Sequence, residues 1–298
     1  MIKISIIGLD TSHSIAYPRL MQAPDCPKNM RIRGMKTVSC LRFETPYQNK
    51  DGLDKRQQQL EQWGIKVTEN FDEAIKGCDA FMLEINDGSF HLEYFKKVAA
   101  LGKPVFLDKP LAMTTADGRA IIELARRHGT KVWCGSSIPF CPPLDKIIAG
   151  AGKIQRAHVF GAYGRAPAGD SLVWYGVHSF EVLQRIMGPG SLKVRALETP
   201  STAIAAIEYA EGREGIVELT PVWTYGGVVT GKLNDQQVTT PFVLNSARAY
   251  YLILRQVKAF FKGGVAPVGM ETTFEGLAMM CAARESITRK EAVAVETL

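Results

Sequence analysis

The sequence predicts an α/β protein: an N-terminal Rossmann-like domain on a parallel sheet, then a second α/β domain on an open, largely antiparallel sheet. Three observations support this prediction. The chain has 298 residues, which is enough for about two domains. In its first half, short β-branched runs alternate with helical stretches, the pattern of parallel strands covered by helices. In its second half, strand-like stretches follow one another with few helices between them, which is typical of an antiparallel sheet.

The expected elements of the first half can be given in order. Strands are expected at residues 3–7, 37–41, 65–67, 80–83, 105–107 and 131–134. Helices are expected at residues 13–21, 54–63, 71–76, 90–101 and 116–128. Gly102 and Gly129 directly follow two of these helices, where a left-handed residue commonly closes a helix.

A domain boundary is expected after the sixth strand, where Pro139, Pro142 and Pro143 interrupt the chain. We therefore assign residues 1–140 to the first domain and residues 141–298 to the second. The second domain is expected to have strands at 157–162, 194–197, 203–209, 215–220 and 228–230, and helices at 180–187, 247–261 and 273–288.

Composition and charge narrow the class of protein. Apolar residues make up 46% and charged residues 22% of the chain, which excludes a fibrous or disordered protein. The net charge of +6 is spread along the chain, so no nucleic-acid partner is expected. No apolar stretch suits a membrane span and the opening run is too short for a secretory signal, so we expect a cytoplasmic protein without a membrane partner. The six cysteines include no C-x-x-C pair, and neither disulfides nor structural zinc are expected.

The first turn, which begins at Gly8, joins a strand to a helix. In this setting, backbone N–H groups and the helix dipole can hold a dinucleotide pyrophosphate. Of the three glycines in G-x-G-x-x-G only Gly8 is present, because Asp10 and His13 occupy the other two places. The Asp10 carboxylate would repel a pyrophosphate unless it turns away to cap the helix, whereas Thr11 and Ser12 offer hydroxyl donors and His13 a cation. A plain turn without a nucleotide stays open as the alternative.

The residues after the second strand meet the adenosine ribose in dinucleotide-binding folds. An acidic residue there suits NAD, and an arginine suits the 2′-phosphate of NADP. Arg42 favours NADP, whereas Glu44 keeps NAD open, and both can equally be solvated loop charges. The expected cofactor is therefore NAD or NADP.

Two later segments, Asp108-Lys109-Pro110 and the stretch from Trp174 to Glu181, form recognisable motifs. They resemble motifs of the Gfo/Idh/MocA oxidoreductase family. The run Asp108-Lys109-Pro110, after the fifth strand, is similar to the family's E-K-P motif, with aspartate in place of the usual glutamate. The stretch from Trp174 to Glu181 is similar to its D-x-G-x-H-x-x-D segment, with tryptophan at the first aspartate and glutamate at the last. Each motif is short, but their order and spacing together are specific.

Further positions extend this resemblance over nearly the whole chain. Asn86 and His91 match an asparagine and a histidine after the fourth strand, and residues 260–268 match a late helix and G-x-x-P-V turn. The resemblance implies a Rossmann domain that holds NAD(H) or NADP(H), and a second domain whose open sheet often pairs subunits. It also implies a sugar, cyclitol or related polyol as the substrate, and hydride exchange at a carbinol carbon. Because few helices are left to cover the second face of the late sheet, we expect a homodimer or homotetramer.

The resemblance also carries over the site residues. Lys109 and His178 match the family's active-site lysine and histidine. The candidate cofactor-binding residues are Gly8, Asp10, Thr11, Ser12, His13, Arg42, Asn86, His91, Asp108, Lys109 and Pro110, with His91 expected at a helix N-terminus on the nicotinamide side. The candidate substrate-binding residues are Tyr163, Arg165, Trp174, Tyr175 and Glu181. No histidine has a metal-ligand spacing such as H-x-x-x-H, so no metal is predicted.

The chemistry of the two catalytic candidates differs. A histidine has an ordinary pKa near 6.5, which suits His178 to take a hydroxyl proton, while Lys109 steadies the developing charge on oxygen. The alternatives are that Lys109 is a surface loop residue held by Asp108, and that His178 is a structural histidine at a helix start. Trp174 and Tyr175 could equally belong to the core.

Three functions stay open from the sequence. The first is an NAD(P)-dependent oxidoreductase acting on a hydroxyl-bearing carbon. The second is a redox-neutral sugar-processing enzyme that retains its nicotinamide, and the third is a catalytically inactive ligand-binding homologue. Asp10 and Trp174 keep the third one open, because each replaces a residue that the resembled motifs use.

Overall fold

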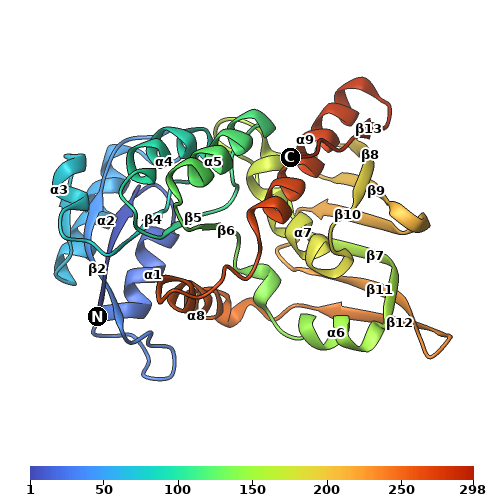
Figure 1. Cartoon of the computed structure of the whole chain (residues 1–298), viewed down its shortest axis with the longest axis horizontal. Helices are drawn as coiled ribbons and strands as arrows, with labels where there is room; N and C mark the ends of the chain where they lie inside the picture. The colour runs from blue at the N-terminus through green and yellow to red at the C-terminus, as the bar shows by residue number, and fades with distance from the viewer. The chain divides into compact units, whose positions relative to one another are not determined.

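The computed structural model describes residues 1–298, and the chain divides into two compact units (Figure 1). The first unit comprises Met1–Ala112, Asp117–Gly135 and Tyr250–Met270. The second comprises Met113–Ala116, Ser136–Ala249 and Glu271–Leu298. The main passage between them, from Gly135 to Ser136, lies close to the boundary expected at residue 140. A single boundary does not separate the units, however, because Tyr250–Met270 belongs to the first unit and Met113–Ala116 to the second.

The first unit contains a parallel sheet, as predicted, and its strand order is β3-β2-β1-β4-β5-β6. Its strands are β1 (Ile2–Ile7), β2 (Met35–Leu41), β3 (Lys66–Thr68), β4 (Ala80–Leu83), β5 (Val105–Leu107) and β6 (Val132–Cys134). The strands β4, β5 and β6 are buried at every position, so their sequences read as continuous apolar runs. This is why short runs were sufficient to locate them.

Helices flank this sheet (Figure 1). They are α1 (His13–Gln22), α2 (Lys50–Gln62), α3 (Phe71–Ile75), α4 (His91–Ala99), α5 (Thr115–His128) and α8 (Ala249–Phe261), with a 3-10 turn η1 (Gly88–Phe90) before α4. Gly129 directly follows α5 with a φ of 62°, which confirms that predicted helix end. Helix α4 ends at Ala99, two residues before the predicted end, so Gly102, with a φ of 65°, does not directly follow it.

Helix α8 comes late in the chain but belongs, from Tyr250 onward, to the first unit. The ring of Phe260 contacts Trp133 on β6, and the ring of Tyr250 contacts Tyr17 on α1, with centroids 6.1 and 5.7 Å apart. These aromatic contacts explain why residues 250–270 pack with the first unit, although the predicted boundary at residue 140 assigns them to the second domain.

The second unit contains a sheet of order β12-β11-β7-β10-β9-β8-β13. Its strands are β7 (Lys153–Ala162), β8 (Ser191–Glu198), β9 (Ala203–Tyr209), β10 (Glu214–Thr220), β11 (Gly226–Leu233), β12 (Gln236–Val243) and β13 (Val293–Ala294). Only β7 and β10 pair in parallel, and the other pairs are antiparallel. The prediction of a largely antiparallel sheet is confirmed, while β12 and β13 were not predicted.

The helices of this unit are α6 (Leu144–Ala151), α7 (Ser171–Met187) and α9 (Met270–Arg289), and its 3-10 turns are η2 (Ile138–Phe140), η3 (Ala210–Gly212) and η4 (Ser246–Arg248). The predicted start of α7 at residue 180 is wrong. The helix begins at Ser171 because the Asp170 carboxylate accepts a hydrogen bond from Val173 N at 3.0 Å and caps it.

One face of this sheet is packed and the other is open. Along β10, Val217 and Leu219 are buried, whereas Ile216 and Glu218 between them are only half-buried. At Gly161 of β7, an added Cβ would lie 2.2 Å from the Ser179 hydroxyl of α7, so α7 packs directly on the strand.

All six cysteines are free thiols. None of the helices combines the length and the apolar character that a membrane span needs.

Candidate functional site

The carboxyl edge of the parallel sheet brings distant segments together. From β1 the chain leads to β2 and β3 on one side, and from β4 it leads to β5 and β6 on the other. The strand order therefore reverses between β1 and β4, and α/β proteins bind ligands at the crevice outside such a reversal. The segments that follow β1, β4 and β5 contain most of the predicted cofactor residues.

Gly8 ends β1 with a φ of 104°. A Cβ added there would lie 2.4 Å from the backbone oxygen of Glu84, just after β4. Only glycine allows this close approach of the two strand ends. The one glycine kept from the G-x-G-x-x-G pattern therefore stands where the backbone requires it.

Asp10 turns into the protein but does not cap α1. One carboxylate oxygen accepts a hydrogen bond from Asn86 N at 2.8 Å, and the other accepts one from the Thr45 hydroxyl at 2.7 Å. The side chain thus ties the segments after β1, β2 and β4 together and is almost fully buried. Burial raises the pKa of Asp10, against the opposing effect of these two hydrogen bonds.

The hydroxyl residues of the turn have different surroundings. Thr11 is buried, and its hydroxyl accepts a hydrogen bond from His13 N at 3.3 Å. Ser12 is the exposed residue of the turn, stands at the N-cap of α1, and is hydrogen-bonded through its side chain to Tyr250. Ser12 is therefore the turn residue that solvent reaches most easily.

His13 does not offer the exposed cation that the sequence suggested. Its Nδ1 lies 2.6 Å from the Asp108 carboxylate and 3.9 Å from that of Glu84. The imidazole stacks on Tyr17 at 5.2 Å and meets the edge of Tyr250 at 5.0 Å. It points into the unit because two buried carboxylates lie there, so its role as a direct cofactor ligand is corrected to an internal one.

Lys109 follows Asp108 and is 3% exposed. The alternative of a surface loop lysine is therefore wrong. Burial tends to raise the pKa of Asp108, but His13 and the Lys109 charge hold it below its ordinary value. Burial and the Asp108 charge raise the pKa of Glu84 well above its ordinary value, and Lys109 acts in the opposite direction. The lysine thus lies among buried carboxylates at the end of β5.

Arg42 is occupied within the protein. Its guanidinium lies 2.8 Å from the Asp54 carboxylate and donates a hydrogen bond of 2.5 Å to the Gln57 side chain, both on α2. Glu44 is exposed to solvent. The segment after β2 therefore presents a carboxylate to solvent while its arginine is neutralised.

His91 begins α4, as predicted, but it does not face a cleft. The ring is fully buried, and its nitrogens lie 2.9 Å from the Ile85 oxygen and 3.3 Å from the Leu111 oxygen. Burial lowers its pKa, which favours the neutral ring. His91 therefore joins the segments after β4 and β5, and its predicted place beside the nicotinamide is corrected to this structural one.

His178 lies inside α7, not at its start. The ring is 6% exposed and meets Tyr175 and Tyr225 edge-on, with centroids 4.9 and 5.9 Å away. Trp174 precedes it by four residues and so occupies the same side of the helix one turn earlier. This placement explains why an aspartate at position 174 could pair with the histidine, and why a tryptophan cannot.

Three further predicted substrate residues make hydrogen bonds or ion pairs that involve a carboxylate. The Tyr163 hydroxyl donates to Glu198 at 2.6 Å, and the Arg165 guanidinium lies 3.2 Å from the same carboxylate. The Glu181 carboxylate accepts a hydrogen bond from Ser136 N at 2.8 Å. The structure brings Tyr163 and Arg165 together, while Glu181 anchors the segment before η2.

The structure adds Trp223, which the sequence analysis missed. Its side chain is 68% exposed, and its ring lies 5.1 Å from Tyr175. An exposed indole beside a tyrosine forms an apolar platform of the kind that contacts the C–H face of a sugar ring. The sequence does offer one signal for this residue: the tryptophan stands in a proline-containing turn directly after a strand, and not at a core position.

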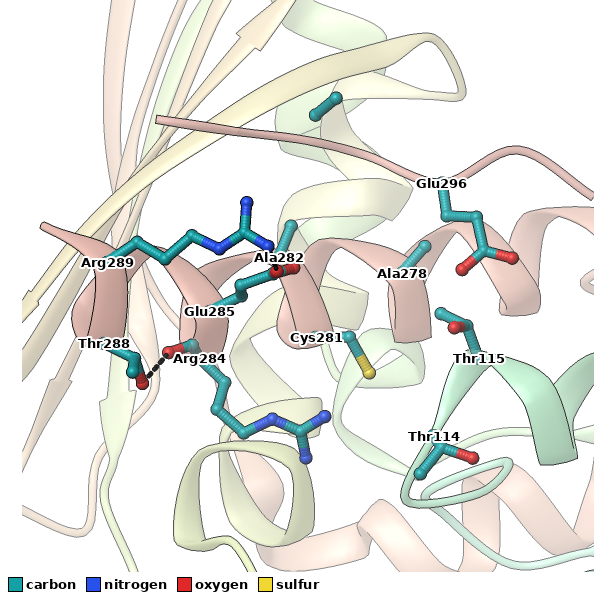
Figure 2. Close-up of a pocket in the computed structure, with 11 residues that line it drawn as sticks. Thr114, Thr115, Ala278, Cys281, Ala282, Arg284, Glu285, Thr288, Arg289 and Glu296 are labelled. Atoms are coloured by element: carbon teal, nitrogen blue, oxygen red, sulfur yellow. Dashed lines mark hydrogen bonds and ion pairs between the residues drawn. The ribbon is translucent and has the colours of Figure 1, made fainter. Parts of the chain in front are cut away.

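A separate cavity of about 460 Å³ lies beside α9 in the second unit (Figure 2). Cys281 and Arg284 point to the side of α9 on which Thr114 and Thr115 lie. The Arg289 guanidinium is paired with Glu285 at 2.6 Å, and Arg284 lies 3.4 Å from the Met113 oxygen. None of the predicted site residues lines this cavity, so it is not the predicted site.

Comparison with known proteins identifies the Rossmann-like segment and the overall fold. Residues 50–136 match a family model described as "Oxidoreductase family, NAD-binding Rossmann fold" (Gfo/Idh/MocA). A stretch of 82 residues is 32% identical to inositol 2-dehydrogenase of Serratia proteamaculans (strain 568), and it covers 27% of this chain but only 23% of that relative.

Solved structures match over the full length. A probable dehydrogenase from Thermotoga maritima has a TM-score of 0.79 at 17% identity, and the match covers 99% of each chain. Scyllo-inositol dehydrogenase from Lactobacillus casei, with bound NAD(H) and scyllo-inositol, has a TM-score of 0.75 at 16% identity, again over 99% of each chain. The resemblance noted in the sequence is thus confirmed for residues 50–136, which match the model of the Gfo/Idh/MocA oxidoreductases, and the whole chain shares the fold of these solved structures.

Proposed function

We propose that the protein is an NAD-dependent oxidoreductase that exchanges a hydride with a hydroxyl-bearing carbon of a sugar, cyclitol or related polyol. The observation that carries the proposal is Lys109, a lysine buried at the carboxyl edge of the Rossmann-like sheet, directly after β5. A lysine is seldom buried without a function or a partner, and this edge is where α/β proteins bind ligands.

The residues around the strand reversal fit a dinucleotide despite the two missing glycines. Gly8 keeps the ends of β1 and β4 close, and the Asp10 carboxylate is turned inward onto Asn86 and Thr45. The carboxylate that would repel a pyrophosphate is thus withdrawn from the surface of the turn. Gly8, Thr11 and Ser12 would hold the pyrophosphate at the start of α1.

The surroundings of Arg42 favour NAD over NADP. Because Asp54 and Gln57 occupy the guanidinium, binding a 2′-phosphate would require breaking those contacts. The exposed carboxylate of Glu44 suits the free 2′-hydroxyl of NAD. These contacts favour NAD as the cofactor, whereas the sequence left both NAD and NADP open.

The bound nicotinamide would supply the hydride acceptor or donor, and the protein's side chains would control charge and protons. Lys109 provides a fixed cation for the substrate oxygen as negative charge develops on it. His178 takes the hydroxyl proton on an imidazole nitrogen during oxidation and returns it during reduction. Tyr175 and Trp223 support the apolar face of the substrate ring.

Calorimetry with NAD⁺, NADH, NADP⁺ and NADPH tests the cofactor assignment. We expect the NAD forms to bind more tightly, and Arg42→Ala to leave their affinity unchanged. Absence of binding for all four forms at millimolar ligand would remove the proposal. Cofactor reduction on addition of inositols, sugar acids or aminosugars would then identify the substrate class.

The replacement of the motif's aspartate by Trp174 favours a second candidate, a homologue that binds its ligand without net oxidation. The same substrate panel separates the possibilities. Product formation without net cofactor reduction would indicate a redox-neutral enzyme with a retained nicotinamide. Ligand binding with neither product nor reduction would indicate a binding protein.

A further inference from the structure

An imidazole and two carboxylates converge inside the first unit. His13 Nδ1, a Glu84 oxygen and an Asp108 oxygen all lie within 4.8 Å of one another, and all three residues are buried. His13 opens α1 after β1, Glu84 directly follows β4, and Asp108 directly follows β5. Because β1, β4 and β5 are adjacent strands, rigid elements bring these side chains to one point.

Three carboxylate oxygens in this cluster lack a hydrogen-bond donor. Both oxygens of Glu84 and Oδ1 of Asp108 are inaccessible to solvent and have no partner. The nearby Tyr17 hydroxyl does not supply the missing donor, since it is itself buried without a partner. Buried acceptors of this kind are destabilising unless a cation or a proton meets them.

A single added proton would satisfy only some of these acceptor oxygens. That proton, held by one of the three oxygens and donated to a second, leaves the third without a donor. A metal ion can contact several oxygens at once, including both oxygens of one carboxylate.

We propose that His13, Glu84 and Asp108 form a binding site for a divalent transition-metal ion, with Zn²⁺ as the ion that suits the donors best. An imidazole nitrogen with two carboxylate oxygens is a three-ligand set typical of zinc, which leaves a fourth position for water or another ligand. The imidazole disfavours Mg²⁺ and Ca²⁺, which prefer oxygen ligands.

The protein already orients the imidazole for this purpose. The rings of Tyr17 and Tyr250 pack against His13, whose Nδ1 lies 2.6 Å from Asp108, and in the metal site this nitrogen would bind the ion in place of that contact. The site depends on a histidine at the third glycine place of the first turn. It is independent of the proposed oxidoreductase function, because binding is measured without substrate or nicotinamide.

Titration of chelator-treated full-length protein with Co²⁺, followed by visible absorption, tests the proposal. We expect about one equivalent to bind with the intense bands of a low-coordinate site, and Zn²⁺ to displace it. Glu84→Gln keeps the size of the side chain but removes its charge, and should weaken Co²⁺ binding by about 100-fold. His13→Ala should abolish the bands.

The matched control is Glu218→Gln, which alters a half-buried glutamate that lies 3.0 Å from His158 in the other unit, and it should bind Co²⁺ as the parent does. Thermal unfolding of the metal-free proteins tests folding separately. Because Glu84→Gln replaces a buried carboxyl group whose oxygens both lack a hydrogen-bond partner, its midpoint without metal should equal or exceed that of the parent. Absence of Co²⁺ and Zn²⁺ binding by the parent, or equal binding by a folded Glu84→Gln variant, would overturn the proposal.

Discussion

Lys109 and His178 differ in what their surroundings allow. The lysine lies among buried carboxylates that keep a cation in place, whereas the histidine is held between aromatic rings. A fixed cation and a group that exchanges a proton are the two roles that hydride transfer at a carbinol carbon requires. Assigning the cation to Lys109 and the proton transfer to His178 follows from this difference.

We predict that Lys109→Met and His178→Ala each lower kcat by about 10² to 10⁴, the usual range for a general acid–base group. The Kd for NAD should stay nearly unchanged, because neither change alters the first turn. Steady-state kinetics on the confirmed substrate and calorimetry measure the two effects. Lys96→Met on the exposed side of α4 and His158→Ala serve as controls. Turnover within threefold of the parent for both variants would show that the catalytic assignment does not apply.

Asp10 allows a separate test of the altered turn. In Asp10→Asn, the amide oxygen can still accept from Asn86 N, and the Thr45 hydroxyl can accept in place of donating. Removing the negative charge near the pyrophosphate should tighten NAD binding by roughly 1 kcal/mol, or about fivefold. Calorimetry checks this against Asp51→Asn, an exposed change on α2 that should have no effect. Weaker binding to Asp10→Asn would instead assign the carboxylate a direct role.

The same variant gives a pH dependence of stability. Because burial raises the pKa of Asp10 above 3.8, the folded protein holds this proton more tightly than the unfolded chain. The stabilisation is therefore fully present below about pH 4 and is lost as the pH rises through the raised pKa. The unfolding free energy of Asp10→Asn relative to the parent should increase from pH 3.5 to 7.5 in urea titrations. A flat difference across this range would show that Asp10 is not perturbed by folding.

Helix α7 positions His178 by packing closely on β7. An added Cβ at Gly161 would lie 2.2 Å from the Ser179 hydroxyl and 2.6 Å from the Tyr225 ring. We therefore expect Gly161→Ala to destabilise the protein by about 1–3 kcal/mol, as overpacking typically does. Chemical denaturation measures the change.

The control is Gly150→Ala in α6, where an added Cβ meets nothing within 4 Å. It should stabilise the protein by about 0.5–1 kcal/mol, because alanine favours a helix over glycine. If Gly161→Ala were as stable as Gly150→Ala, the close contact between α7 and β7 would not constrain the fold.

Sequence reasoning succeeded best where apolar runs are continuous. The central strands of the parallel sheet were located to within about a residue because both faces are buried. Strand β12 was missed because it lies at a sheet edge, is rich in glutamine and threonine, and contains Pro241. The first half of α7 was missed because Trp174, Tyr175 and Gly176 do not suggest a helix, and the Asp170 cap alone was not recognised.

The residues of the candidate site could likewise be predicted only where the local sequence identifies them. Asp108 and Lys109 were found because neighbouring residues form a readable motif. Glu84 was missed because it lies inside an apolar run, and nothing local distinguishes it from a solvated charge after a strand. Its contact with His13 arises from the order of β1, β4 and β5, which is a property of the sheet and not of either segment. Trp223 was missed for a similar reason, since its neighbour Tyr175 is on another element.

The open face of the second sheet predicts self-association. Phe160, Ile204, Ile216 and Val228 are only half-buried there, next to the exposed Leu197. Uncovered apolar side chains on a sheet tend to be buried against a second copy. We expect a homodimer or homotetramer by light scattering, and smaller species for Ile216→Glu. A parent protein that is monomeric at micromolar concentration would contradict this prediction.

The return of Tyr250–Met270 to the first unit has a consequence for biosynthesis. As the chain leaves the ribosome, the β1 to β6 sheet can form early, but the aromatic partners of His13, Tyr17 and Trp133 are still unmade. The ribosome must complete nearly the whole second unit before Tyr250 and Phe260 emerge. Nascent chains therefore hold an unfinished first unit for most of translation, and a gene fragment that stops near residue 140 encodes a unit that lacks its closing helix.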